Sequence, residues 1–143
     1  MSDLPATVLF ACTMNSVRSA MAEDILKNLH GDRIYVDSAG VRAGEPDGFM
    51  IEVMAEIDID LSNHASKTLS TLDDTSFDLI VFLSPKAQHA AVELTRWMSC
   101  DVEYWPTHDP DVIRGRRDSR LDGYRQIRDQ IYAKIKQRFP LQD

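Results

Sequence analysis

Two patterns of hydrophobic and polar positions alternate along the chain. The first is a short segment rich in apolar and β-branched residues, which is typical of a strand in a buried sheet. Such segments cover residues 7–11, 33–38, 77–83 and 102–105. The second is a longer segment whose apolar residues recur every three or four positions, which predicts an amphipathic helix. Such segments cover residues 19–30, 47–57, 85–98 and 121–139.

The regular alternation of these segments indicates one α/β domain over residues 1–143. We expect a three-layer fold of the flavodoxin-like type, with a four-stranded parallel sheet and helices on both faces. Ligands of such sheets bind beyond the carboxyl ends of the strands. Cys12 follows the first predicted strand, Ser38 ends the second, and Asp109 comes a few residues after the fourth. We therefore expect these three side chains to meet at one edge of the sheet.

The loop between the first strand and the first helix carries the most distinctive chemistry. It begins at Cys12 and continues through Thr13, Met14, Asn15, Ser16, Val17, Arg18 and Ser19. Backbone N–H groups of such a loop, together with the Arg18 guanidinium, suit a tetrahedral oxyanion. A cysteine in that positive field should have a lowered pKa and act as a thiolate nucleophile, with no metal or other cofactor. The spacing of Cys12 and Arg18 alone also fits a small buried cysteine and a surface arginine.

The residues around this loop resemble the low-molecular-weight protein tyrosine phosphatases, a superfamily shared with the thioredoxin-coupled arsenate reductases. The resemblance covers nearly the whole chain in the family's order. The matching stretches are 8–23, 36–40, 59–64, 77–80 and 105–110. It implies the phosphotyrosine protein phosphatase I type of fold, with Cys12 as nucleophile and Arg18 as phosphate clamp. Asp109 would be the general acid and then the base, although an Asp-Pro pair by itself also fits a simple turn.

The resemblance also implies a set of supporting residues. Asn15 would take a left-handed backbone conformation, which asparagine tolerates. Ser19 would donate a hydrogen bond to the Cys12 sulfur. Ser38 and His64 would belong to a network around Asn15, although His64 also fits an ordinary surface histidine.

Several positions depart from the pattern of the tyrosine phosphatases. Met14 stands where their loop usually has glycine, and Ala20 where it has proline. Val17 replaces a second cysteine that can form a protective disulfide with the nucleophile. Asp111 and Val112 follow the Asp-Pro pair, where aromatic residues normally grip the phosphotyrosine ring. The resemblance therefore implies phosphoryl chemistry and leaves the preferred leaving group open.

Three functions follow from these observations. The first is a cysteine-dependent phosphomonoester hydrolase, a protein tyrosine phosphatase, acting on a phosphorylated protein or a small phosphomonoester through a phosphocysteine. The second is an arsenate reductase that uses an external small thiol. Cys100, the one other cysteine, is placed at a helix–strand junction and cannot supply the two further cysteines of a thioredoxin-coupled relay. The third is a non-catalytic anion-binding regulatory module, for which a nucleophile and an acid would be superfluous.

The composition of the chain argues against several classes of binding partner. A net charge of −7 argues against a nucleic-acid-binding surface over the whole domain. No apolar run approaches the ~18 residues that a membrane span needs, and no signal peptide is evident, so we expect a cytoplasmic protein. Two cysteines and four scattered histidines give no zinc-site spacing.

A basic cluster fits either a solvated loop or a surface that steers anions. Its members are Arg114, Arg116, Arg117 and Arg120.

Overall fold

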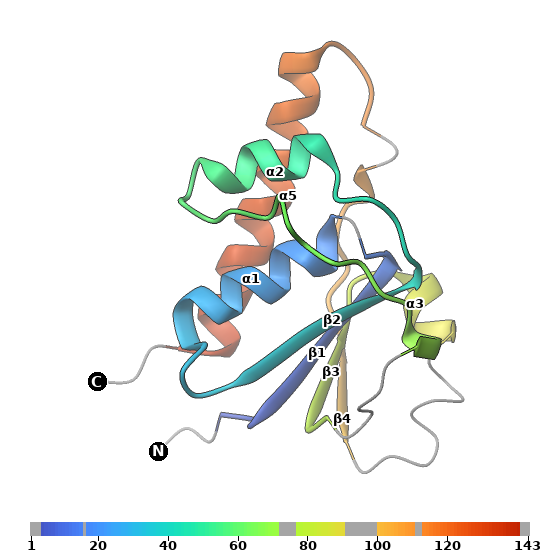
Figure 1. The fold of residues 1–143 in the computed structure, drawn as a ribbon, viewed down its shortest axis with the longest axis vertical. Coiled ribbons are helices and arrows are strands. Elements are labelled where there is room, and N and C mark those ends of the chain that lie inside the picture. Colours follow the sequence, from blue (N-terminus) through green and yellow to red (C-terminus); the bar gives the residue numbers. More distant parts are fainter. Residues whose placement is uncertain (1–3, 16, 72–76, 91–99, 111–112, 141–143) are drawn as a thin grey trace.

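The computed structural model describes residues 4–15, 17–71, 77–90, 100–110 and 113–140 of the chain. Parallel strands form one four-stranded sheet in the order β2-β1-β3-β4 (Figure 1). The bounds are Thr7–Met14 for β1, Tyr35–Arg42 for β2, Leu79–Phe82 for β3 and Asp101–Tyr104 for β4. Strand β1 is central, so its carboxyl end is flanked by chain from both neighbouring strands.

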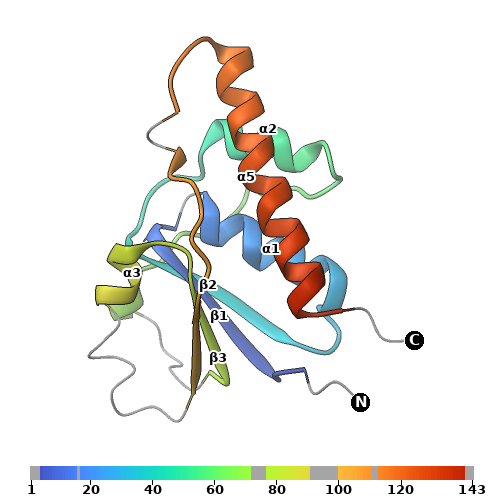
Figure 2. The same ribbon diagram turned by 180° about the vertical axis from the view of Figure 1, so that it is seen from behind.

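Helices cover both faces of this sheet (Figures 1 and 2). One face carries α1 (Arg18–His30), α2 (Gly48–Ala55) and α5 (Arg117–Arg138). The other carries α3 (Pro85–Ala90) and the short 3-10 helix η1 (Leu69–Thr71). The predicted three-layer α/β architecture is confirmed. Residues 91–98 of the helix expected over 85–98 lie outside the described residues.

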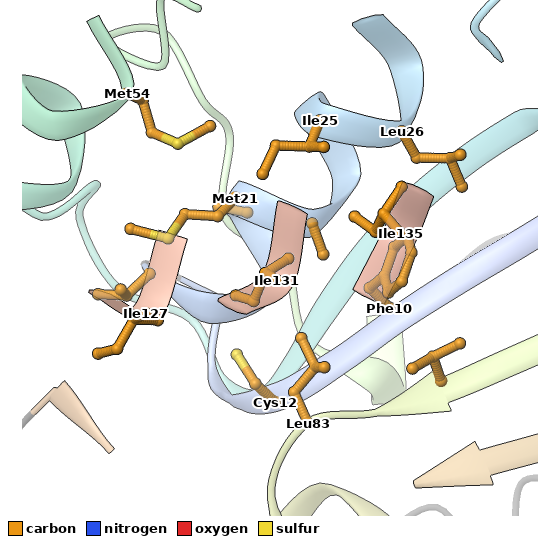
Figure 3. Packing of buried hydrophobic residues seen from close by; sticks show 14 of the residues in the cluster. Phe10, Cys12, Met21, Ile25, Leu26, Met54, Leu83, Ile127, Ile131 and Ile135 are labelled. Atoms are coloured by element: carbon orange, nitrogen blue, oxygen red, sulfur yellow. The ribbon is translucent and has the colours of Figure 1, made fainter. Parts of the chain in front are cut away.

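The core divides along β1 into two clusters. Phe10 and Cys12 belong to the cluster on one face, which Figure 3 shows together with Met21 of α1 and Ile131 of α5. Leu9 and Ala11 face the opposite cluster, which includes Ala87 of α3. Both faces of β1 are therefore buried, which explains why its sequence is continuously apolar rather than alternating.

The boundaries of β1 and β2 differ from the expected ones. Strand β1 does not end before Cys12 but continues to Met14 on the side of β2, where Cys12 pairs with Gly40 and Met14 with Arg42. On the side of β3 the pairing ends at Ala11 and Phe82, as expected. Because β2 extends to Arg42, Ser38 lies in the middle of that strand and not at its end. The added hydrogen bonds come from a partner strand distant in sequence, which local periodicity does not register.

The helix boundaries follow local signals more closely. Asp47 caps α2, since its carboxylate accepts hydrogen bonds from the N–H groups of Phe49 and Met50. Soon after α2 ends, Asp58 takes a positive φ of 63°, which breaks the helical path. Helix α5 begins at Arg117, one turn before the expected start at residue 121. No helix among the described ranges is both long and apolar enough to span a membrane.

Candidate active site

Cys12 lies at the bottom of the loop between β1 and α1. Its side chain is 1% exposed and forms part of the core. The Sγ atom donates to the Met14 carbonyl oxygen at 2.7 Å and lies 2.9 Å from Ser19 Oγ. Ser16, which belongs to the same loop, is outside the described residues.

The expected lowering of the Cys12 pKa is wrong for this structure. Burial raises the pKa of the Cys12 thiol above its ordinary value, because the thiolate would lose its hydration. The hydrogen bonds from Ser19 and the charge of Arg18 act in the opposite direction and lower the pKa, but burial outweighs them. Burial of the sulfur in this conformation therefore opposes formation of the thiolate.

The side chain of Asn15 is the centre of a buried hydrogen-bond network. Its Nδ2 donates to Ser19 Oγ at 2.7 Å and to Ser38 Oγ at 2.9 Å. Its Oδ1 accepts from the Lys67 backbone N–H at 3.1 Å and lies 3.1 Å from His64 Nε2. The structure thus brings Ser19, Ser38 and His64 together around Asn15. Asn15 does not take the expected left-handed conformation, since Asp58 is the non-glycine residue with positive φ in the described chain.

The hydrogen bonds of Asn15 and Ser38 determine whether Ser19 acts as a donor or an acceptor. Ser38 Oγ donates to the carboxylate of Glu23, so its oxygen is free to accept from Asn15. Ser19 Oγ likewise accepts from Asn15 and keeps its own proton for another partner. That partner is the Cys12 sulfur, 2.9 Å away. The network therefore orients Ser19 as a hydrogen-bond donor to sulfur, which favours the thiolate.

Glu23 and Lys67 are members of this network that sequence reasoning missed. Glu23 is buried in α1 and also pairs with Lys27. One signal could have found it: Glu23 comes four residues after Ser19 in a predicted helix, so both face the same side. Lys67 contributes a backbone N–H, and its side chain pairs with Asp37 at 2.6 Å. No sequence motif reports a backbone donor of this kind.

Arg18 and Asp109 line one cavity of about 680 Å³ at the carboxyl ends of the strands. Arg18 is 6% exposed, and its Nη1 donates to the carbonyl oxygens of Leu83 at 3.3 Å and Thr107 at 3.2 Å. Asp109 is exposed and lines the same cavity. Thr13, Met14 and Val17 also line this cavity, whereas the buried Cys12 is not among its lining residues.

The segment that carries Asp109 is anchored to the core by Trp105. The Trp105 ring is buried between Phe10 and Phe139, with ring centroids 5.8 and 6.4 Å away. Its indole N–H donates to Glu103 at 3.0 Å. Three residues separate this anchor from Asp109, and one of them, Thr107, accepts the hydrogen bond from Arg18.

The basic cluster does not form part of this cavity. Arg117 forms an ion pair with Glu52 of α2, and the Arg120 guanidinium lies 4.5 Å from the centre of the Phe49 ring. Two of its four members thus attach α5 to α2. Arg114 and Arg116 are exposed.

Cys100 lies far from Cys12. The register places Val8 of β1 beside Leu79 of β3 and Leu79 beside Asp101 of β4, so Cys100 is level with Thr7. Cys12 is five positions beyond Thr7 in β1, so the two cysteines are offset by about 16 Å along the strand direction at ~3.3 Å per residue. A disulfide needs Cα atoms within about 7 Å.

Within the described ranges, no group of three or more His, Cys, Asp or Glu residues could hold a metal ion.

The structure thus combines a parallel sheet, the segment from Cys12 to Arg18 between β1 and α1, and a cavity lined by both Arg18 and Asp109. The chain belongs to the low molecular weight phosphotyrosine protein phosphatase family, whose model matches residues 7–140. This membership confirms the resemblance seen in the sequence.

The curated relatives that match this chain over most of its length include arsenate reductases. Arsenate reductase 2 of Staphylococcus saprophyticus is 34% identical over 131 residues, which cover 92% of this chain and 94% of the relative. Arsenate reductase of Bacillus subtilis is 30% identical and covers 91% and 92%. A solved arsenate reductase in the phosphate-binding state aligns with a TM-score of 0.76 and 26% identity over 92% and 94%. A tyrosine phosphatase from Erwinia amylovora shares the fold at 20% identity and a TM-score of 0.75, over 91% and 88%. The family model is therefore named for phosphatases, whereas the relatives at 30% identity or more are named arsenate reductases.

Proposed function

We propose that this protein is a cysteine-dependent phosphomonoester hydrolase with Cys12 as nucleophile, Arg18 as phosphate clamp and Asp109 as acid and base. The observation that carries the proposal is that Arg18 and Asp109 line the same cavity, together with Thr13, the residue that follows Cys12 in the loop. At about 680 Å³ the cavity has room for a leaving group beside the phosphate. A bare oxyanion would need far less space.

The reaction has two balanced steps. In the first, the Cys12 thiolate attacks phosphorus, the S–P bond forms, and the P–O bond to the leaving group breaks as Asp109 gives its proton to the leaving oxygen. In the second, Asp109 as carboxylate takes a proton from water, the oxygen of that water bonds to phosphorus, and the S–P bond breaks. The products are the free alcohol, inorganic phosphate and the original thiolate.

Substrate binding must change the loop from the conformation seen here. The Cys12 thiol now donates to the Met14 carbonyl oxygen, and Arg18 donates to Leu83 and Thr107. A phosphate would compete for the Arg18 donors and take the place of the Met14 carbonyl next to sulfur. Ser19 already donates to sulfur, so the thiolate gains its stabilising contact without further rearrangement.

An arsenate reductase that uses an external thiol is the second candidate. The observation that favours it is that relatives at 30% identity or more are named arsenate reductases. In this reaction the Cys12 thiolate binds arsenic and water leaves; an external thiol then attacks the Cys12 sulfur and arsenite leaves with the electron pair. A second external thiol releases Cys12, and the two external thiols end as a disulfide. Cys100 has no part in this sequence.

Parallel assays separate the two candidates. We expect hydrolysis of p-nitrophenyl phosphate that is insensitive to EDTA and abolished by Cys12→Ser. Asp109→Asn should lower kcat by about 10²–10⁴-fold, the usual contribution of a positioned acid. Asp32→Asn, at an exposed site outside the cavity, is the matched control and should leave kcat unchanged.

The same variants are then assayed for arsenate reduction with glutathione. Arsenate reduction without ester hydrolysis would replace the proposed function by the second candidate. Hydrolysis that survives Cys12→Ser, or that disappears with EDTA, would refute the cysteine mechanism altogether.

A further inference from the structure

The cavity has an apolar side beyond the oxyanion loop. Met14 and Tyr104 line it and are 38% and 39% exposed, although both are large hydrophobic residues. They stand at the carboxyl ends of β1 and β4, the two strands that flank β3. Exposed apolar side chains that share one concave surface are typical of a ligand contact. Tyr104 thus brings an aromatic ring to the cavity from β4. In tyrosine phosphatases the aromatic residues normally follow the Asp-Pro pair, where this chain has Asp111 and Val112.

The cavity also has a cation besides Arg18. Lys86 lines it from the first turn of α3. Helix α3 lies near the carboxyl end of β1 (Figure 1). Its position is fixed through Ser84, two residues before it, whose Oγ accepts from Thr13 Oγ1 at 3.0 Å. Ala87, the next residue, is fully buried and anchors the helix. Lys86 is exposed, and within the described part of the chain its side chain makes no hydrogen bond or ion pair.

We propose that Met14, Tyr104 and Lys86 form a leaving-group site that selects aryl phosphate esters carrying a second negative charge, such as a carboxylate. The inference rests on the proposed phosphomonoesterase function and specifies its substrate class. The oxyanion occupies the loop above Cys12, the aryl ring lies against Tyr104 and Met14, and the added anion pairs with Lys86. Asp109, the carboxylic acid of this cavity, delivers its proton to the bridging oxygen between these two halves.

The two halves of the leaving-group site make separate contributions. An aromatic contact of ordinary strength corresponds to about 2- to 12-fold in affinity. An exposed ion pair of ordinary strength corresponds to about 2- to 5-fold and should weaken in high salt. Each factor can be measured by adding one group at a time to the ligand.

Isothermal titration calorimetry with three phosphonates tests the inference on the whole protein. Phenylphosphonate should bind about 2- to 12-fold more tightly than methylphosphonate, and Tyr104→Ala should remove this advantage while Tyr104→Phe keeps it. The 4-carboxyphenylphosphonate should bind about 2- to 5-fold more tightly again, and Lys86→Met should remove that second advantage. Lys134→Met, at an exposed lysine of α5 outside the cavity, is the matched control and should change neither ratio.

The outcomes distinguish this inference from the proposed function. If the phosphonates bind but both ratios are the same in the variants as in the wild type, the leaving-group site is refuted while the hydrolase stands. If the wild type binds all three phosphonates equally, the site is refuted in the same way. If no phosphonate binds and p-nitrophenyl phosphate is not hydrolysed, the proposed function fails and the inference falls with it.

Discussion

Gly40 of β2 shows how closely two distant segments approach beneath the active-site loop. A Cβ atom at this position would lie 2.5 Å from the backbone nitrogen of Asn15 and 2.6 Å from the Arg42 carbonyl oxygen. Both neighbours are backbone atoms, so neither can move aside as a flexible side chain would. The backbone of the oxyanion loop can therefore approach β2 this closely only because glycine has no side chain.

We expect Gly40→Ala to lower the free energy of unfolding by about 1–3 kcal/mol, the usual cost of overpacking, and to weaken phosphate binding. Gly48→Ala is the matched control, because a Cβ at Gly48 at the start of α2 meets nothing within 4 Å. That variant should be stabilised by ~0.4–1 kcal/mol. Urea unfolding measures both changes. Equal effects of the two substitutions would contradict the close packing at Gly40.

At the scale of elements, a group of ion pairs attaches α5 to α2. Arg125 binds Glu56 through Nε and Nη2, at distances of 2.8–3.1 Å. Arg128 Nη1 binds Glu56 at 2.8 Å and the Val53 carbonyl oxygen at 2.7 Å. Hydrogen bonds from Arg125 and Arg128 lower the pKa of Glu56 to about 2. The contribution of Glu56 to stability must therefore depend on pH.

The sign of that dependence follows from the lowered pKa. Glu56 has an ordinary pKa of 4.5 in the unfolded chain, so its stabilising contribution is complete above pH 4.5 and is lost as the pH falls toward 2. Glu56→Gln should therefore be less stable than the wild type at pH 7, and the difference should shrink progressively below pH 4.5. Urea unfolding across this pH range measures the difference.

Glu45→Gln provides the control for this measurement. Glu45 is exposed and makes no hydrogen bond or ion pair within the described residues, so its substitution should change the free energy of unfolding by less than about 0.5 kcal/mol at every pH. A Glu56→Gln deficit that stays constant down to pH 2 would contradict the role of the two arginines.

At the scale of the whole molecule, the sheet keeps the two cysteines apart. Cys12 lies at the carboxyl end of β1 and Cys100 directly before the start of β4, with β3 between them. Neither forms a disulfide in the structure. Because strand pairing fixes both positions, joining them would require unfolding part of the sheet.

Oxidation of the protein should therefore yield no Cys12–Cys100 disulfide. Mass spectrometry of non-reduced peptides after treatment with hydrogen peroxide checks this directly. Cys100→Ser should leave p-nitrophenyl phosphate hydrolysis, and any arsenate reduction with glutathione, unchanged within about 2-fold. A loss of arsenate reduction confined to Cys100→Ser would show that the cysteine takes part in electron transfer after all.

The parts of the site that could be predicted are those marked by a short local motif or by the order of strands and helices. Cys12, Arg18 and Ser19 belong to one short loop, and Asp109 belongs to an Asp-Pro pair that follows a predicted strand. The motifs and the order of the elements were therefore enough to expect these residues at the same edge of the sheet. Glu23 could have been inferred from helical spacing. Tyr104 and Lys86 could not, because they reach the cavity from β4 and α3, and their convergence depends on the order of strands in the sheet.

The sequence by itself determined the alternation of strands and helices, the composition of the oxyanion loop and the shortage of cysteines for an internal relay. These properties depend on local periodicity and covalent order, which are present in the chain before it folds. The tertiary structure alone decided the burial of the Cys12 sulfur, the extension of β1 to Met14 and the set of side chains that share the cavity. Each of these depends on burial and pairing between segments far apart in sequence. Desolvation of the thiol is the clearest case, since the same loop that supplies positive charge also removes water from the sulfur.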